Sequence, residues 1–224
     1  GGVNMKKAYK WIIALIVIGF VIVGLFFSMA PDQIPVHYDI NGQIDRWGSK
    51  YEFILFPLIN LLFGGFMAWL ARREQKQGRD MNEQVVAGMT VCVLVFFNLL
   101  WLFFMWKAID VDNFDSGLGE LSTKALMILV FASFIPLGNS MPKAQRNSTY
   151  GLRTKWSMAN DRCWQKSQRF GGYALVISGI IGSLLCALLP SHWGGYIMLL
   201  IITIATVTCI VGSYRIYRNE QIGK

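Results

Sequence analysis

The amino-acid sequence predicts an all-α integral membrane protein: a six-transmembrane-helix bundle with a short extracellular hairpin and a cytoplasmic interfacial helix. Three observations predict this fold class, namely the composition, six long apolar blocks and the one-sided placement of the basic residues. Hydrophobic residues make up 54% of the 224 residues and charged residues 15%, whereas about a quarter of a soluble domain is charged. This composition excludes an ordinary soluble protein of the same length.

Six apolar blocks supply the predicted transmembrane helices. Each lacks Asp, Glu, Lys, Arg and His, and a helix needs about 20 residues to cross a bilayer. Within hydrocarbon the backbone must satisfy its own hydrogen bonds, which apolar runs of this length do as helices. The first block is longer than the apolar core of a secretory signal, roughly 7–15 residues, so we expect an uncleaved helix. The predicted spans are residues 11–30, 53–71, 85–106, 125–141, 172–190 and 193–214.

The spans and the segments between them suggest two unequal membrane units. Residues 5–71 form a two-helix unit with an outer hairpin loop. A charged cytoplasmic linker follows at residues 72–84. Residues 85–224 form a four-helix unit, which contains a long basic loop at residues 142–170, called the signature segment below.

The basic residues predict the orientation. Of the 21 Lys and Arg residues, 17 fall at the N-terminus, in the second and fourth loops and in the C-terminal tail, which all lie on one side of the membrane. We expect a multi-pass protein of the cytoplasmic (inner) membrane, and the positive-inside rule places that side, and so both termini, in the cytoplasm. Lys and Arg beside anionic lipid headgroups gain about 1 kcal/mol each. Membrane lipids therefore account for the net charge of +8, and we predict no direct nucleic-acid binding.

A short hairpin is predicted between the first two spans. Asn41-Gly42 is a preferred pair for a two-residue type I′ turn, because both central residues need positive φ. The expected cross-strand pairs are Val36 with Trp47, Tyr38 with Asp45 and Ile40 with Gln43. Candidate binding residues on this outer loop are His37, Asp39, Asp45, Arg46 and Trp47.

Calcium binding is an alternative function for the same loop. Asp39, Asn41 and Asp45 offer oxygen ligands. The glycine is misplaced for an EF-hand, however, and Lys50 stands where the bidentate acidic ligand belongs. We therefore predict no metal ion.

The signature segment is predicted to contain the interfacial helix. Ser157 is a good N-cap for a helix over residues 158–170, and helical spacing places Arg162, Lys166 and Arg169 on one face. Trp156 and Trp164 favour the same depth, at the level of the headgroups. A solvated basic connector is the alternative for this segment.

The residue types exclude several functions or make them less favoured. The four cysteines form no C-x-x-C pair, and there are two histidines, His37 and His192, so no cofactor is predicted. A coupled transporter normally carries ionisable residues within its spans, and this chain has none there. No H-E-x-x-H or G-x-S-x-G motif is present, and we predict that the protein is not an enzyme. Transport of a small solute or lipid, or lipid chemistry using Arg153, Arg162 and Arg169, stays open as an alternative.

Two sets of residues resemble a known family. The signature of the SdpI-type immunity proteins is similar to Gly138-Asn139-Ser140-Met141, Asn147, Gly151-Leu152-Arg153-Thr154, Trp156, Trp164 and Arg169-Phe170. The small N-terminal domain of unknown function that accompanies it is similar to Ile34-Pro35-Val36-His37, Asn41-Gly42 and Asp45-Arg46-Trp47-Gly48. The chain departs from the family at Lys155, where proline is common, and at Ser157, where threonine is common.

The resemblance implies a function in toxin resistance. It implies protection of a bacterial cell against a secreted, membrane-active toxin peptide. It also implies a signalling role, in which a cytoplasmic transcriptional repressor is held at the membrane when toxin is bound. Under this hypothesis the output element would comprise Asn139, Gly151, Arg153, Thr154, Trp156, Trp164 and Arg169.

Overall fold

The computed structural model describes residues 5–38, 44–110, 117–147 and 149–222. Six of its helices are long and apolar enough to cross a membrane, which confirms the predicted all-α multi-span fold. The order of elements is α1 (Met5–Met29), β1 (Gln33–Tyr38), β2 (Ile44–Ser49), η1 (Lys50–Ile54), α2 (Leu55–Lys76), α3 (Asp80–Ile109), α4 (Gly117–Ser140), η2 (Met141–Lys143), α5 (Asp161–Leu188), η3 (Ser191–Trp193) and α6 (Gly194–Ile222).

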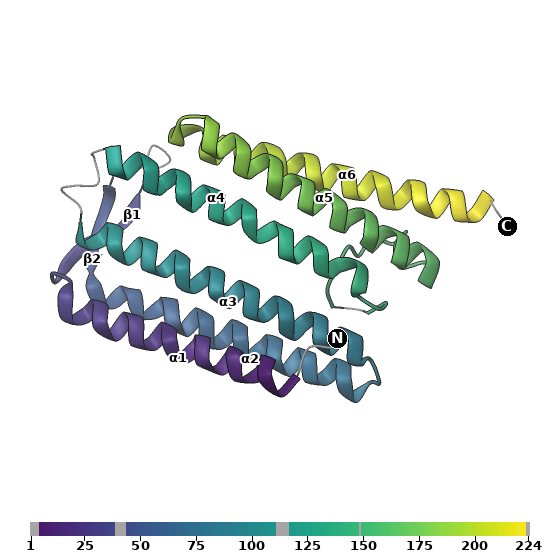
Figure 1. The fold of residues 1–224 in the computed structure, drawn as a ribbon, viewed down its shortest axis with the longest axis horizontal. Coiled ribbons are helices and arrows are strands. Elements are labelled where there is room, and N and C mark those ends of the chain that lie inside the picture. The colour runs from purple at the N-terminus through teal and green to yellow at the C-terminus, as the bar shows by residue number, and fades with distance from the viewer. Residues whose placement is uncertain (1–4, 39–43, 111–116, 148, 223–224) are drawn as a thin grey trace.

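The six helices pack as two groups of three. Figure 1 shows α1, α2 and α3 side by side, and α4, α5 and α6 side by side, with α3 facing α4 between the groups. Both chain termini lie at one end of the molecule, called the terminal end below. The hairpin lies at the opposite end, called the hairpin end (Figure 1). The predicted division into two units at residues 72–84 stays a prediction, but α3 packs on α1 and α2 in the structure.

The charged segment 72–84 is largely helical. It contains the last turn of α2, a short turn at residues 77–79 and the first turn of α3. Gly78 has a φ of +73°, a conformation that glycine adopts without steric cost. Asp80 and Glu83 lie in the first turn of α3, where acidic side chains favour the positive end of the helix dipole.

Aromatic stacking and one polar cluster hold the first group together. The rings of Phe56 and Trp101 stack with centroids 4.1 Å apart. The Trp101 indole N–H donates to Asn60 Oδ1 at 3.1 Å, and Asn98 Nδ2 donates to the Leu15 carbonyl at 3.2 Å. Buried amides of this kind bond helices to each other inside a membrane, and here they join α3 to both α1 and α2.

Close backbone contact characterises the second group. A Cβ added at Gly138 of α4 would lie 2.6 Å from the Gly172 carbonyl of α5, and one added at Gly172 would lie 2.6 Å from the Gly138 carbonyl. Small residues at a helix crossing permit this approach in membranes. The last turn of α4, just before the signature segment, is therefore fixed against α5.

The hairpin is present, but its register differs from the prediction. Strands β1 and β2 are antiparallel and pair Pro35 with Trp47 and Tyr38 with Ile44, with irregularities on both sides of His37. The predicted pairs Val36–Trp47 and Tyr38–Asp45 are therefore wrong. Ile34 is 0% exposed and packs in the core, and burial of this side chain fixes the register. The two irregularities leave one extra residue on each strand, Val36 on β1 and Asp45 on β2. The predicted turn at Asn41-Gly42 and the pair Ile40–Gln43 lie outside the described residues.

The predicted interfacial helix also needs correction. α5 runs without a break from Asp161 to Leu188, so its first turns take the place of a separate helix over residues 158–170. Its N-cap is Asn160, whose Oδ1 accepts from the Cys163 N–H at 2.8 Å. Ser157 does not cap the helix because its hydroxyl is bonded to the Leu152 carbonyl at 2.7 Å.

Candidate functional site

The signature segment is a compact structure that a buried glutamine holds in place. Gln168 of α5 is fully buried. Its Nε2 donates to the Leu152 carbonyl and its Oε1 accepts from the Leu152 N–H, both at 2.9 Å. Gly151 has a φ of +93°, and a Cβ there would lie 2.5 Å from Gln168 Oε1. Only glycine fits this position without strain, which gives the physical reason for the Gly151 of the signature.

Thr154 and Ser157 close the next turn through reciprocal bonds. The Thr154 N–H donates to Ser157 Oγ at 2.9 Å, and the Ser157 N–H donates to Thr154 Oγ1 at 3.1 Å. Thr154 Oγ1 also lies 2.9 Å from Ser213 Oγ of α6. The Trp156 ring packs edge-on against Tyr214, with centroids 5.2 Å apart. The turn is therefore attached to the terminal end of α6.

Trp164 holds the start of the segment in place. The prediction that it lies among the lipid headgroups is wrong, because it is buried in the protein. Its side chain is 1% exposed, and its indole N–H donates to the Ala144 carbonyl at 2.7 Å. A buried indole N–H needs a partner, which the loop backbone supplies. Trp164 therefore ties residues 142–147 to α5.

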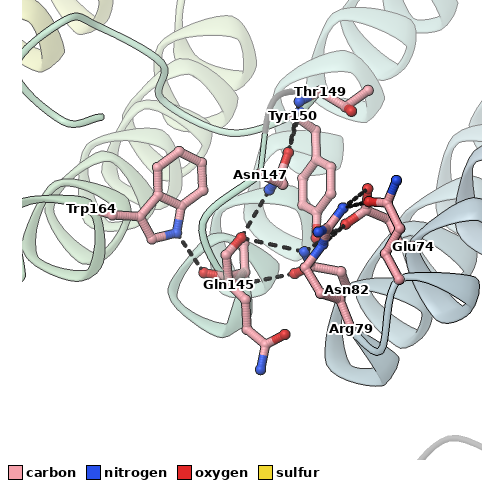
Figure 2. A network of polar contacts seen from close by, with 10 residues as sticks. Glu74, Arg79, Asn82, Gln145, Asn147, Thr149, Tyr150 and Trp164 are labelled. Carbon is pink, nitrogen blue, oxygen red and sulfur yellow. Dashed lines mark hydrogen bonds and ion pairs between the residues drawn. The ribbon is translucent and has the colours of Figure 1, made fainter. Parts of the chain in front are cut away.

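A second network joins the signature segment to the turn between α2 and α3 (Figure 2). Glu74 is 2% exposed. Its carboxylate accepts from Arg79 Nε at 2.7 Å and Nη2 at 2.9 Å, and from Asn82 Nδ2 at 2.8 Å. Two-pronged bonds between Arg and a carboxylate are among the strongest and most directional in proteins. Glu74 raises the pKa of Arg79 through these bonds.

The network continues from Asn82 into the signature segment. Asn82 Oδ1 accepts from the Gln145 N–H at 2.8 Å. Asn147 Nδ2 donates to the Gln145 carbonyl at 2.9 Å, while its Oδ1 accepts from the Thr149 and Tyr150 N–H groups at 2.8 and 2.9 Å. Burial, together with the Glu74 carboxylate, raises the pKa of Tyr150. The two groups of helices are thus bonded to each other at the terminal end (Figure 2).

Three other residues predicted for this site are exposed. Arg153 Nη1 reaches the Thr149 carbonyl at 3.4 Å, a long bond. The Arg169 guanidinium lies 5.9 Å from the centre of the Tyr173 ring. Asn139 lies in the last turn of α4. The structure therefore separates the predicted set into Gly151, Thr154, Trp156 and Trp164, which organise the segment, and three outward-facing residues.

The polar residues of the hairpin are paired near its surface. His37 Nδ1 lies 2.6 Å from Asp45 Oδ1, and Arg46 Nη2 donates to Glu52 Oε2 at 3.0 Å. Trp47 is 54% exposed. Asp39 lies outside the described residues, as does Asn41, so the calcium alternative also rests partly on residues outside them.

Four residues that hold the signature segment in place were not predicted from the sequence. They are Glu74, Arg79, Asn82 and Gln168. Glu74 is an acidic residue within an otherwise basic run, which is a weak signal for a buried partner. Asn82 and Gln168 gave no signal, because their bonds join segments 63 and 16 residues away.

Comparisons with known proteins find matches for both parts of the chain that resemble the family. Residues 143–213 match the SdpI/YfhL protein family, and residues 14–61 match the domain of unknown function DUF1648. The chain is 23% identical over 218 residues to the immunity protein SdpI of Bacillus subtilis strain 168, covering 96% of this chain and 98% of that protein. No solved structure matches the chain significantly. The predicted resemblance is confirmed: in this multi-span membrane protein, residues 14–61 are similar to the DUF1648 domain and residues 143–213 to the SdpI/YfhL protein family.

Proposed function

We propose that this protein protects a bacterial cell against a secreted, membrane-active toxin peptide. The observation that carries the proposal is the alignment with an immunity protein along nearly the whole of both chains. That match spans the hairpin and the signature segment together, so it is not a likeness of apolar helices alone. A role in binding and sensing is favoured over catalysis, because the relative is named for immunity.

The hairpin is the proposed toxin-facing surface. It is held by its base, where Ile34 is buried and Lys50 Nζ donates to the Ala30 carbonyl at 3.1 Å. An exposed tryptophan on a fixed support is a common centre of binding energy. Trp47 would supply apolar contact, and His37, Asp45 and Arg46 would supply polar contact. Asp39 belongs to the same proposed set but lies outside the described residues.

The terminal end is proposed to face the cytoplasm, because the basic residues gather there. A reporter that is active only in the cytoplasm tests this orientation. Fused after Lys76, Arg146 or Lys224 it is expected to be active, and fused after Gly42 or Gly117 it is expected to be silent. Activity at Gly42 would overturn the orientation.

The signature segment is the proposed output element, which would hold a cytoplasmic transcriptional repressor. Support comes from the Glu74 network, since it bonds the segment to the group of helices that carries the hairpin. If toxin binding rearranged that group of helices, the bond between Asn82 and Gln145 would transmit the change to the segment. Arg153 faces outward from the segment and would be available to a partner.

The immunity experiment compares two exposed tryptophans at the hairpin end. A sensitive strain expressing the protein is expected to survive the cognate toxin peptide and to keep its membrane potential. Trp47→Ala should reduce survival, while Trp193→Ala, at a residue 50% exposed on the loop between α5 and α6, should not. Unchanged killing by the correct toxin, with the protein confirmed in the membrane, would refute the immunity role. Equal effects of the two substitutions would refute the hairpin assignment alone.

A further inference from the structure

A cavity of about 730 Å³ opens beside the signature segment at the terminal end. One wall is the chain from Pro142 to Arg146, and the other is the first turns of α5. Its volume falls in the range of roughly 300–1,000 Å³ that is usual for small-molecule sites. The hairpin does not line this cavity, and the Glu74 network reaches it at Gln145.

The lining is basic. Lys143, Arg146 and Arg169 contribute three positive charges, and Asp161 contributes one negative charge. Asp161 accepts from Arg146 Nε at 2.8 Å, so its charge is matched within the lining. The cavity therefore keeps an excess of positive charge for an anion, contributed by Lys143 and Arg169 from opposite walls.

Both walls are held in position. Trp164 lines the cavity and bonds the Ala144 carbonyl of the opposite wall. Arg146 is fixed by Asp161 and by the Met158 carbonyl, to which its Nη1 donates at 3.3 Å. On α5, Asp161, Gln165 and Arg169 are four residues apart and so share one helix face. The backbone walls therefore lose little conformational freedom when an anion binds between them.

The cavity lies where the apolar spans end. Lys143 is two residues beyond the predicted span 125–141, and Arg169 is three residues before the span 172–190. Side chains at this level meet lipid headgroups, whose phosphates attract Lys and Arg. We propose that the cavity binds the phosphate group of an anionic phospholipid, with Lys143 and Arg169 as its cationic ligands. The proposal does not depend on the toxin-immunity role.

The test measures lipid preference on the full-length protein. Wild type is reconstituted in bilayer nanodiscs of phosphatidylcholine and phosphatidylglycerol. The protein is then released, and native mass spectrometry identifies the lipids that stay bound to it. Wild type should retain phosphatidylglycerol preferentially, and Lys143→Gln/Arg169→Gln should lower that preference about tenfold. The matched control Lys155→Gln/Arg162→Gln removes two charges from the same segment but outside the cavity lining, and it should retain the preference.

Two further arms identify the source of the phosphate and guard against misfolding. Gln165→Glu adds a carboxylate to the cavity without removing a ligand, and it should also lower the preference. Inorganic phosphate, compared with chloride at equal ionic strength, should not raise the thermal midpoint of delipidated wild type. If it does so in wild type but not in the double variant, a soluble phosphate is the ligand and the lipid assignment is overturned. No preference in wild type, or an equal loss in the control pair, overturns the site.

Discussion

At the terminal end Glu74 and Arg79 form an ion pair whose carboxylate is 2% exposed, whereas at the hairpin end Arg46 and Glu52 form theirs with side chains 57% and 39% exposed. The first pair also binds Asn82, which continues into the signature segment. Exposed pairs contribute little to stability, while removing one partner of a buried pair is costly. The comparison indicates that the buried pair fixes the geometry of the terminal end, whereas the exposed pair constrains the hairpin only weakly.

The largest expected effect is that of Gly151→Ala. The substitution combines an unfavourable positive φ with a Cβ that would lie 2.5 Å from the buried Gln168 side chain. We expect a loss of about 3 kcal/mol in the free energy of unfolding, measured by reversible denaturation in detergent. Gly65→Ala is the matched control, because a Cβ there meets nothing within 4 Å. Equal stability of the two variants would contradict the tight fit at Gly151.

Glu74→Gln is expected to have the next largest effect. The new amide replaces one carboxylate oxygen with an NH2 donor, which faces an N–H donor of Arg79 whichever way the amide is turned. We expect a loss of about 2 kcal/mol in the free energy of unfolding. Faster hydrogen exchange of the Gln145 N–H should accompany it, since that group bonds to Asn82. The double variant Glu74→Gln/Arg79→Gln should lose less than the sum of the single losses, and strict additivity would argue against the pair.

Glu52→Gln sharpens the comparison from the hairpin end. It removes an ion pair of similar length, 3.0 Å to Arg46, but in surroundings open to solvent. We expect a change below about 0.5 kcal/mol in the free energy of unfolding, measured under the same conditions. A loss as large as that of Glu74→Gln would show that exposure does not distinguish the two ends.

Arg153→Lys should leave stability unchanged and affect signalling alone. Its long bond to the Thr149 carbonyl contributes little, but lysine cannot reproduce the planar fork of arginine. If Arg153 contacts a partner, a repressor-controlled reporter should lose its response to toxin while the protein stays abundant in the membrane. Arg162→Lys on the same segment is the control. A fully responsive Arg153→Lys protein would exclude the specific contact.

The apolar blocks by themselves predicted six helices long and apolar enough to cross a membrane, because a run of about 20 apolar residues in hydrocarbon satisfies its backbone hydrogen bonds as a helix. The two family segments were also recognisable from their residues, Gly151-Leu152-Arg153-Thr154 above all. Helix ends were less predictable. Ser157 and Asn160 are both good caps by residue type, and only the bond between Ser157 Oγ and Leu152 decided between them.

The tertiary structure alone decided which polar residues act together. Glu74 pairs with Arg79 across a tight turn, Asn82 reaches a backbone group 63 residues away, and Gln168 holds Leu152 from the next helix. Such bonds leave no periodic pattern, because each depends on where the helices meet and not on the spacing along one of them. The register of the hairpin was decided in the same way, since the burial of Ile34 outweighed the pairing expected from Asn41-Gly42.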